Sequence, residues 1–392
     1  MARKKVVVIY QTAGGGHQAN ALAVEAAIRE RHGEEIDVFL LHIAQELQSQ
    51  RVKALYEAYN LMLKSNPRMV KVGFRLINML DPEAILLPLL PKVRHNLEAC
   101  IRREKPDLIL SVFSVINHTA INLLKRMGWY GRVPYLIFCT DLSHGFLRQW
   151  VDSRATAMIA LSKEAADQMI QFGYPAQRIR ILNGLPVNPV FTKLQIGRVE
   201  ARQQLQLMPE HFTILITMGG VAVKNTWRFA RDLAASGMAI QIVVVCGRNR
   251  LLERRARRIA ARSPVPMRIF GFTDQMPLLM EAADVVITKP GPGTIAEAIA
   301  KRRPLLVDAI KEPMPQEKGN LDYISHHGIG DAIERRSDLV KLIRRYMEDK
   351  PRYDAVVENM GKLGNSQAVY DLADYIVSQI PESANKATLA QA

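Results

Sequence analysis

The chain contains few of the residues from which disulfide frameworks and metal centres are built. Its 392 residues include three cysteines, Cys100, Cys139 and Cys246, which are far apart and form no Cys-x-x-Cys pair. This spacing argues against a disulfide scaffold or a zinc ribbon and is typical of proteins in a reducing cytoplasm. Asp-x-Asp pairs are absent from the sequence, and no His/Cys cluster has metal-ligand spacing. We therefore expect no metal and no other cofactor.

Long apolar runs and several common catalytic motifs are also missing. No stretch approaches the roughly 18 uninterrupted apolar residues of a membrane-spanning helix. The basic start of the chain leads through a short apolar run directly into glycines, which favours a first strand over a signal peptide. Neither a Gly-x-Ser-x-Gly elbow nor a GxxxxGK[ST] loop occurs. The sequence predicts a soluble or peripheral protein. It carries the motif of neither the α/β-hydrolases nor the P-loop NTPases.

Positive charge is present in excess. Lys and Arg outnumber Asp and Glu by 53 to 38, which gives a formal net charge of +15. Such an excess favours an anionic partner, such as a phosphate, a nucleic acid or an acidic membrane surface. The basic run at 248–263 has helical spacing without interleaved aromatic residues, so we interpret it as a solvated helix face and expect no nucleic-acid partner.

Two sets of short apolar runs alternate with helix-like stretches. Runs of this kind, without alternation in polarity, are typical of parallel strands that are buried on both faces. The first set is Val6–Tyr10, Ile36–His42, Leu108–Phe113, Tyr135–Thr140, Met158–Leu161 and Ile179–Leu182. The second set is Thr213–Thr217, Gln241–Cys246, Met267–Phe270, Asp284–Thr288 and Pro304–Asp308. The pattern predicts an α/β protein with two doubly wound, Rossmann-like domains.

Prolines and a glycine interrupt the pattern near residues 183–202 and indicate the boundary between the domains. We expect a first domain at 1–195, a second at 196–364, and a helix at Gln367–Gln379 within a terminal segment 365–392 whose end is frayed. The stretch Arg51–Pro91 is too long for a simple crossover and has apolar and basic residues at helical spacing. It is either a pair of amphipathic helices packed on the first domain or an element that enters the surface of an anionic membrane.

The strongest local signal is the sequence ITKPGPGTIAEA, at 287–298. A strand ends at Thr288, glycines 291 and 293 keep the turn free of side chains, and a helix is expected to begin near Thr294. The N–H groups and the dipole of its first turn form an anion site that suits a pyrophosphate. Glu297, one turn further on, is placed to accept hydrogen bonds from ribose hydroxyls. The alternative is a tight strand–helix turn without a ligand.

Three glycines and a histidine follow the first strand, in the sequence GGGHQANA. Gly14, Gly16 and Ala19 satisfy the dinucleotide fingerprint, but no acidic residue closes the second strand, as that fingerprint requires. His17 lies in the first helical turn, where the positive helix end disfavours the imidazolium form. The residue is therefore a candidate general base, or a histidine that only forms hydrogen bonds near a helix start.

Polar residues also follow two other strands. Asp141, Ser143 and His144 follow the run Tyr135–Thr140, at the same sheet edge as His17, where they line a site or cap the next element. Gln316, Glu317 and Asn320 follow the strand Pro304–Asp308, in what we expect to be a polar loop of the second domain.

The chain resembles the monogalactosyldiacylglycerol synthase family and its bacterial glycolipid synthase relatives. The resemblance extends from about Val6 to about Gly330 and includes TAGGGHQANA, KPDLILSVFSVINH, TDLSH, GLPVNPVF, VVVCGRN and GFTDQM. Its most specific motifs are ITKPGPGTIAEA and QEKGN. It implies a GT-B fold with the active site in the cleft, and an inverting, metal-independent transfer of a hexose from a UDP-sugar to diacylglycerol.

The resemblance also implies roles for individual residues. His17 occupies the family's base position, and Arg51–Pro91 corresponds to its membrane-facing, acceptor-side region. From their position beside His17, we also expect Gly15, Gly16, Asp141 and His144 on the acceptor side of the cleft. On the UDP-sugar side, the diphosphate is held by Gly291, Gly293 and Thr294, and the ribose by Glu297. The sugar is faced by Gln316 and Glu317, in a loop that Asn320 supports. Near the donor phosphates or the hinge lie Gly219 and Gly220. Plant members carry an acidic residue before the glycines, whereas Thr12 and Ala13 stand here, so a carboxylate that orients His17 is expected from elsewhere.

We accordingly expect a cytoplasmic glycosyltransferase that lies on the inner face of the cell membrane. Its partners are expected to be a UDP-sugar, diacylglycerol or a related lipid, and an anionic membrane surface. Two alternatives remain open at this point. One is a transferase of N-acetylglucosamine to the lipid intermediate of peptidoglycan, and the other is a UDP-sugar sensor without catalytic activity.

Overall fold

The computed structural model of the chain describes residues 3–11, 16–43, 91–219, 225–311 and 313–382. The predicted element Arg51–Pro91 lies outside these residues except for Pro91, and Gly15 and Gly220 also lie outside them.

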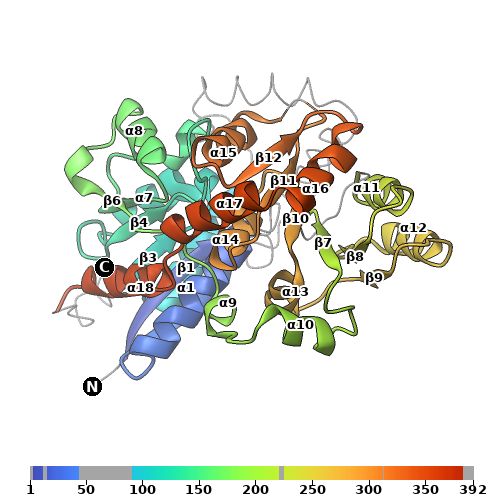
Figure 1. Cartoon of the computed structure of the whole chain (residues 1–392). Helices are drawn as coiled ribbons and strands as arrows, with labels where there is room; N and C mark the ends of the chain where they lie inside the picture. Colours follow the sequence, from blue (N-terminus) through green and yellow to red (C-terminus); the bar gives the residue numbers. More distant parts are fainter. Residues whose placement is uncertain (1–2, 12–15, 44–90, 220–224, 312, 383–392) are drawn as a thin grey trace.

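The first domain is built on six parallel strands in the order β2-β1-β3-β4-β5-β6 (Figure 1). Helix α1 covers one face of this sheet, and α6, α7 and α8 cover the other. Because both faces are covered, the central strands β3, β4 and β5 are fully buried and almost entirely apolar. The strands are β1 (Lys4–Tyr10), β2 (Ile36–His42), β3 (Leu108–Ser111), β4 (Tyr135–Phe138), β5 (Ala157–Ala160) and β6 (Ile179–Ile181), and the helices are α1 (Gly16–His32), α6 (Pro91–Glu104), α7 (Asn117–Arg126) and α8 (Lys163–Gln171).

The second domain repeats this plan with the strand order β12-β11-β10-β7-β8-β9, again all parallel. Helices α11, α12, α16 and α17 cover one face, and α13, α14 and α15 cover the other. The strands are β7 (Phe212–Thr217), β8 (Ile240–Val245), β9 (Met267–Phe270), β10 (Val285–Thr288), β11 (Leu305–Asp308) and β12 (Gly330–Ile333). The helices are α11 (Asn225–Ala234), α12 (Arg250–Ala260), α13 (Met276–Ala282), α14 (Pro292–Ala300), α15 (Pro315–His326), α16 (Asp338–Glu348) and α17 (Lys350–Leu363). The two sheets confirm the predicted α/β architecture with two doubly wound domains.

Every strand that the sequence predicts is present, with ends that differ by two residues or fewer. Strand β12 was not predicted, because its sequence Gly-Asp-Ala-Ile is short and half polar, as suits the edge of a sheet. Helix α14 begins at Pro292 and not near Thr294, since proline at the first helical position needs no N–H partner.

The chain passes between the domains through α9 (Pro189–Lys193) and α10 (Arg198–Gln204). The guanidinium of Arg202 fixes α10 to the second domain, with Nη2 2.5 Å from Oδ2 of the buried Asp284. The last helix, α18 (Ala368–Ser378), returns to the first domain and lies beside α1 (Figure 1). There His32 Nε2 lies 2.7 Å from Asp374 Oδ1.

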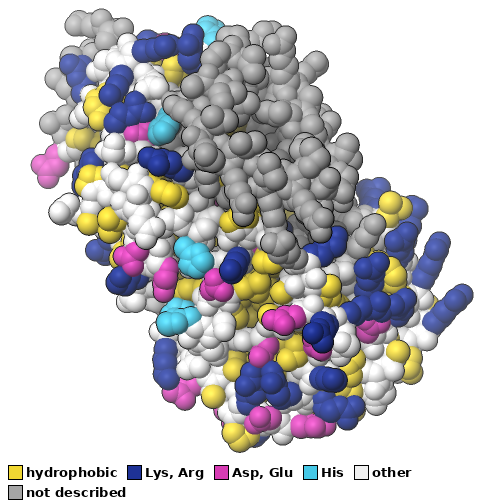
Figure 2. All heavy atoms as spheres, turned by 90° about the horizontal axis from the view of Figure 1, so that it is seen from above, with side chains coloured by type: hydrophobic (Ala, Val, Ile, Leu, Met, Phe, Trp, Pro, Cys, Tyr) yellow, Lys and Arg dark blue, Asp and Glu magenta, His cyan; other side chains and the backbone are white. Residues whose placement is uncertain are grey.

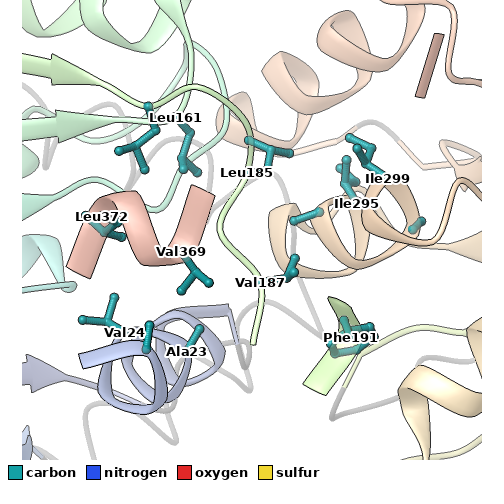
Figure 3. Packing of buried hydrophobic residues seen from close by; sticks show 14 of the residues in the cluster. Ala23, Val24, Leu161, Leu185, Val187, Phe191, Ile295, Ile299, Val369 and Leu372 are labelled. Carbon is teal, nitrogen blue, oxygen red and sulfur yellow. The ribbon is translucent and has the colours of Figure 1, made fainter. Parts of the chain in front are cut away.

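One hydrophobic cluster continues from the first domain into the second. Figure 3 shows Val24 of α1 and Leu372 of α18 on one side of this cluster, and Ile295 of α14 on the other, with Leu185 and Val187 of the connecting segment between them. All five side chains are buried. The apolar contacts thus join the domains beside the N-termini of α1 and α14. No helix in the described part of the chain is long and apolar enough to cross a bilayer.

Candidate active site

The candidate residues lie where the strand order of each sheet changes direction. In the first sheet the chain leaves β1 to form β2 on one side and β3 on the other, and β7, β8 and β10 repeat this arrangement in the second sheet. Parallel sheets bind ligands outside the carboxyl ends of their strands at such positions. His17 follows β1, Gly219 follows β7 and Lys289 follows β10, so both positions carry candidate residues.

His17 is the second residue of α1 and is partly buried. Its Nδ1 lies 2.9 Å from Oγ1 of Thr140, and the carbonyl of Val112 accepts a hydrogen bond from the ring. The rings of Phe113 and Trp150 pack beside it, with centroids 5.5 and 5.8 Å away. Burial lowers the pKa of His17 to about 4, so the imidazole is neutral at pH 7 and can accept a proton.

Among the described residues, no carboxylate contacts the His17 ring, which differs from the expectation of an orienting acid. Thr140 and Val112 hold the ring instead. Asp141 is one residue further along but turns to Trp150, whose Nε1 donates a 2.8 Å hydrogen bond to Oδ2 of Asp141. Burial raises the pKa of Asp141 to about 6. Asp141 therefore reaches His17 only through the indole that the two residues share.

His144 lies at the contact between the domains. Its Nε2 is 3.3 Å from Oδ2 of Asp322 on α15, and both side chains are about half exposed. Ser143 is buried nearby. The structure thus brings Asp141 close to His17 but places His144 against the second domain.

The two glycine-bearing segments meet at the N-termini of α1 and α14. A Cβ atom added to Gly293 would lie 3.9 Å from Cα of Gly16, so the backbones of the two domains are separated here by little more than the width of one side-chain atom. Helix α14 leaves the N–H groups of Gly293 and Thr294 without partners in its own first turn. Together with the helix dipole, these groups can bind an anion. The base candidate of one domain therefore lies next to the anion site of the other.

A cation that the sequence analysis did not single out lies beside the glycine turn before α14. The built Cβ positions of Gly219 and Gly291 are 3.3 and 3.5 Å from Cε of Lys289, so the lysine stem passes between the two turns. Gly219 itself has a left-handed backbone with φ of 76°. Lys289 follows the last residue of β10, where a long cationic side chain directly before the glycines was the available signal.

Glu297 lies in the second turn of α14 and is partly buried. In the described part of the chain, its carboxyl group has no hydrogen-bond or ion-pair partner. Burial raises its pKa to about 8. The carboxyl group is therefore mostly protonated at pH 7. Hydrogen bonds between its oxygens and the hydroxyls of a ligand would stabilise it.

Three buried polar atoms at the end of β10 and on α15 also lack partners among the described residues: Oγ1 of Thr288, Oε1 of Gln316 and Oδ1 of Asn320. The amide nitrogen of Asn320 donates a 2.8 Å hydrogen bond to the carbonyl of Pro290, which holds the turn in place. Unsatisfied buried polar atoms are rare, and their concentration here indicates a site for a polar ligand.

The prediction of a polar loop at 316–320 is wrong about secondary structure, because these residues belong to helix α15. They include Gln316, Glu317 and Asn320. Glu317 caps that helix, with Oε2 accepting a 3.0 Å hydrogen bond from the backbone N–H of Met314. Its carboxylate thus has a structural role, whereas Asn320 contacts the glycine turn and Oε1 of Gln316 is buried without a partner among the described residues. The proline at the start of α15 was the signal for a helix here.

The chain is similar in sequence to a family of known proteins. The chain matches the monogalactosyldiacylglycerol (MGDG) synthase family over residues 17–187 and the glycosyltransferase family 28 C-terminal domain over residues 213–374. Probable monogalactosyldiacylglycerol synthase 2 of Oryza sativa subsp. japonica is 30% identical over 384 residues, which cover 95% of this chain and 80% of that protein. Monogalactosyldiacylglycerol synthase 3 of Arabidopsis thaliana is 28% identical and covers 94% of this chain and 80% of its own length.

Solved structures share the fold at lower identity. MurG of Acinetobacter baumannii aligns with a TM-score of 0.65 and 15% identity, covering 96% of this chain and 100% of its own. Anabaena HepE, solved with UDP-glucose, aligns with a TM-score of 0.57 and 16% identity, covering 95% and 99%. These likenesses concern the fold alone, and they confirm the predicted GT-B architecture.

Proposed function

Because the chain belongs to the monogalactosyldiacylglycerol synthase family of glycosyltransferases acting on a lipid acceptor, we propose that it transfers a hexose from a UDP-sugar to diacylglycerol. The observation that carries the proposal is the contact between the two helix N-termini. It brings a neutral histidine from one domain next to an anion site of the other.

The proposed reaction is a single displacement with inversion. The acceptor hydroxyl oxygen attacks the anomeric carbon from the face opposite the diphosphate, and the bond from that carbon to the diphosphate oxygen breaks. The bonding electron pair leaves with UDP, and the hydroxyl proton passes to the neutral His17 ring. Thr140 and Val112 hold the ring in place for this transfer, which general-base catalysis accelerates by about 10² to 10⁴.

The second domain would bind the donor. In this proposal the N–H groups of Gly293 and Thr294, together with the ammonium group of Lys289, stabilise the charge on the leaving diphosphate without a metal. Glu297 would accept hydrogen bonds from the ribose, as its unpartnered carboxyl suggests. The free amide oxygen of Gln316 would face the sugar.

The decisive experiment incubates the purified protein with diacylglycerol liposomes and a panel of UDP-sugars, including UDP-N-acetylglucosamine, in the presence of EDTA. We expect mass spectrometry to detect hexosyl-diacylglycerol. His17→Ala should reduce its formation by about 10² or more while UDP binding persists. Absence of any glycolipid with every donor would rule out the transfer. If His17→Ala were as active as the wild type, His17 would not be the general base.

A further inference from the structure

Three metal-ligating side chains from the two domains converge at the surface, away from His17. They are Glu164 in the first turn of α8 and the neighbouring His326 and His327 at the end of α15. One ligand atom of each lies within 4.8 Å of the other two. We propose that these residues form a binding site for a divalent transition metal that joins the two domains.

The ligand set suits zinc and related ions. Two imidazoles and one carboxylate are a common zinc donor set and leave a fourth position for water. Tetrahedral coordination requires the ligand atoms to approach to about 3.4 Å, given metal–ligand bonds of about 2.0–2.2 Å. Small rotations of the side chains supply this movement, because His326 is exposed and the other two are half-buried. Exposure also leaves a path by which the ion enters.

Neighbouring groups prepare His327 for coordination. The ring of Tyr323 packs against it, with centroids 4.2 Å apart, and the His326 ring meets its edge at 5.0 Å. These two ring contacts restrict the orientation of the His327 imidazole.

The segments that carry the ligands are already held together. Gln168, one turn beyond Glu164 on α8, accepts a 2.6 Å hydrogen bond from Gly145 N–H and donates one of 3.2 Å to the Phe146 carbonyl. This loop packs on α15 so closely that a Cβ atom at Gly319 would lie 2.2 Å from the His144 carbonyl oxygen. The metal ligands therefore lie along an existing contact between the domains.

Helix α15 connects this contact to the glycine turn. Asn320 donates to the Pro290 carbonyl, and His326 follows six residues later, about 9 Å along the helix axis. An ion bound by Glu164 and the histidine pair would fix α15, and with it the turn before α14, to the first domain. Binding would thus stabilise the two-domain arrangement, whether or not the proposed transfer takes place.

The test is a Co²⁺ titration of the EDTA-treated and dialysed full-length protein, followed by visible absorption. We expect one Co²⁺ per chain, a ligand-field band that Zn²⁺ abolishes, and a rise in Tm with Zn²⁺. Glu164→Gln and His326→Ala should each weaken binding at least about tenfold and remove the Tm increase. Two matched controls should keep both properties: Asp167→Asn, further along α8, and His95→Ala, an exposed histidine on α6.

Folding is checked by Tm in EDTA, which should be the same for the wild type and the Glu164→Gln and His326→Ala variants, since both side chains are at least partly exposed. Three results would overturn the proposal. The first is the lack of Co²⁺ and Zn²⁺ binding. The second is unchanged affinity in Glu164→Gln, because the histidine pair alone would then hold the ion without joining the domains. The third is one ion per two chains in a metal-dependent dimer.

Discussion

Glu297 carries a proton at neutral pH that a bound nucleotide sugar would displace. Burial raises its pKa to about 8, and hydrogen bonds from ribose hydroxyls stabilise the carboxylate and lower that pKa in the complex. Donor binding then releases a proton, so affinity should rise with pH up to about 8 and level off above it. Calorimetry with a UDP-hexose at several pH values measures this, since the diphosphate diester does not titrate in that range.

The control for this effect is Glu297→Gln, which keeps the shape of the side chain but cannot ionise. Its affinity should be independent of pH between about 6 and 8. His17 does not contribute in this range, because its pKa of about 4 leaves it neutral throughout. A wild-type affinity that does not change with pH would show that the carboxyl group stays protonated in the complex.

Thr140 positions the His17 ring through a single hydrogen bond to Nδ1. Thr140→Val keeps the side-chain shape and removes the hydroxyl, which should lower kcat of the proposed transfer about fivefold to tenfold, as loss of one neutral hydrogen bond implies. Donor affinity should not change. Thr119→Val on α7 is the matched control, because the buried hydroxyl of Thr119 has no partner among the described residues. Equal losses in the two variants would contradict a positioning role for Thr140.

At the scale of elements, local sequence was sufficient where burial was complete. Strands such as β8 are buried on both faces, and a short apolar run of this kind is typical of a parallel sheet covered by helices on both sides. Strand β12 has no apolar run from which it could be predicted, because it lies at the edge of its sheet. The polar first residues of α15 predict a loop, although they form the start of a helix. The glycine turn before α14 was predictable because backbone geometry depends on residues adjacent in sequence.

Long-range partners could not be predicted in the same way. Thr140 meets His17 across 123 residues, and no local pattern distinguishes it from other threonines that follow strands. The position of Lys289 between two glycine turns depends on the pairing of β7 with β10. The metal-ligating group combines residues of α8 and α15, so spacing along the sequence gave no sign of it.

The return of α18 to the first domain makes the C-terminal helix part of that domain's core. Leu372 is fully buried in the cluster that also contains Val24 of α1 (Figure 3). Leu372→Ala should therefore lower the free energy of unfolding by about 2–5 kcal/mol, as for other leucines truncated in a core. The exposed Asp371→Ala, one residue away, should change it by no more than about 0.5 kcal/mol. Chemical denaturation of both variants distinguishes a packed helix from a dispensable one.

At the scale of the whole molecule, the net charge of +15 is distributed unevenly. Figure 2 shows Lys and Arg side chains gathered at the end of the face where α11 and α12 lie. Helix α12 alone exposes Arg250, Arg254, Arg255, Arg257 and Arg258. The described residues therefore carry a basic surface at this end, and the segment at 51–91 carries further cations, all of which lie outside the described residues.

Of the two alternatives for the segment at 51–91, we propose the one in which its basic and apolar residues bind an anionic lipid surface. Flotation with vesicles rich in anionic lipid should recover the protein at about 0.1 M salt and lose it near 1 M, where screening shortens the Debye length from ~10 to ~3 Å. Replacing Lys64, Arg68 and Lys71 by Gln should weaken flotation at low salt. Replacing Arg250, Arg254 and Arg255 by Gln is the matched control, because it changes the net charge equally on α12. If only the α12 variant failed to float with the vesicles, α12 would be the membrane contact. Flotation that persisted at high salt would show that electrostatic attraction does not bind the protein to the membrane.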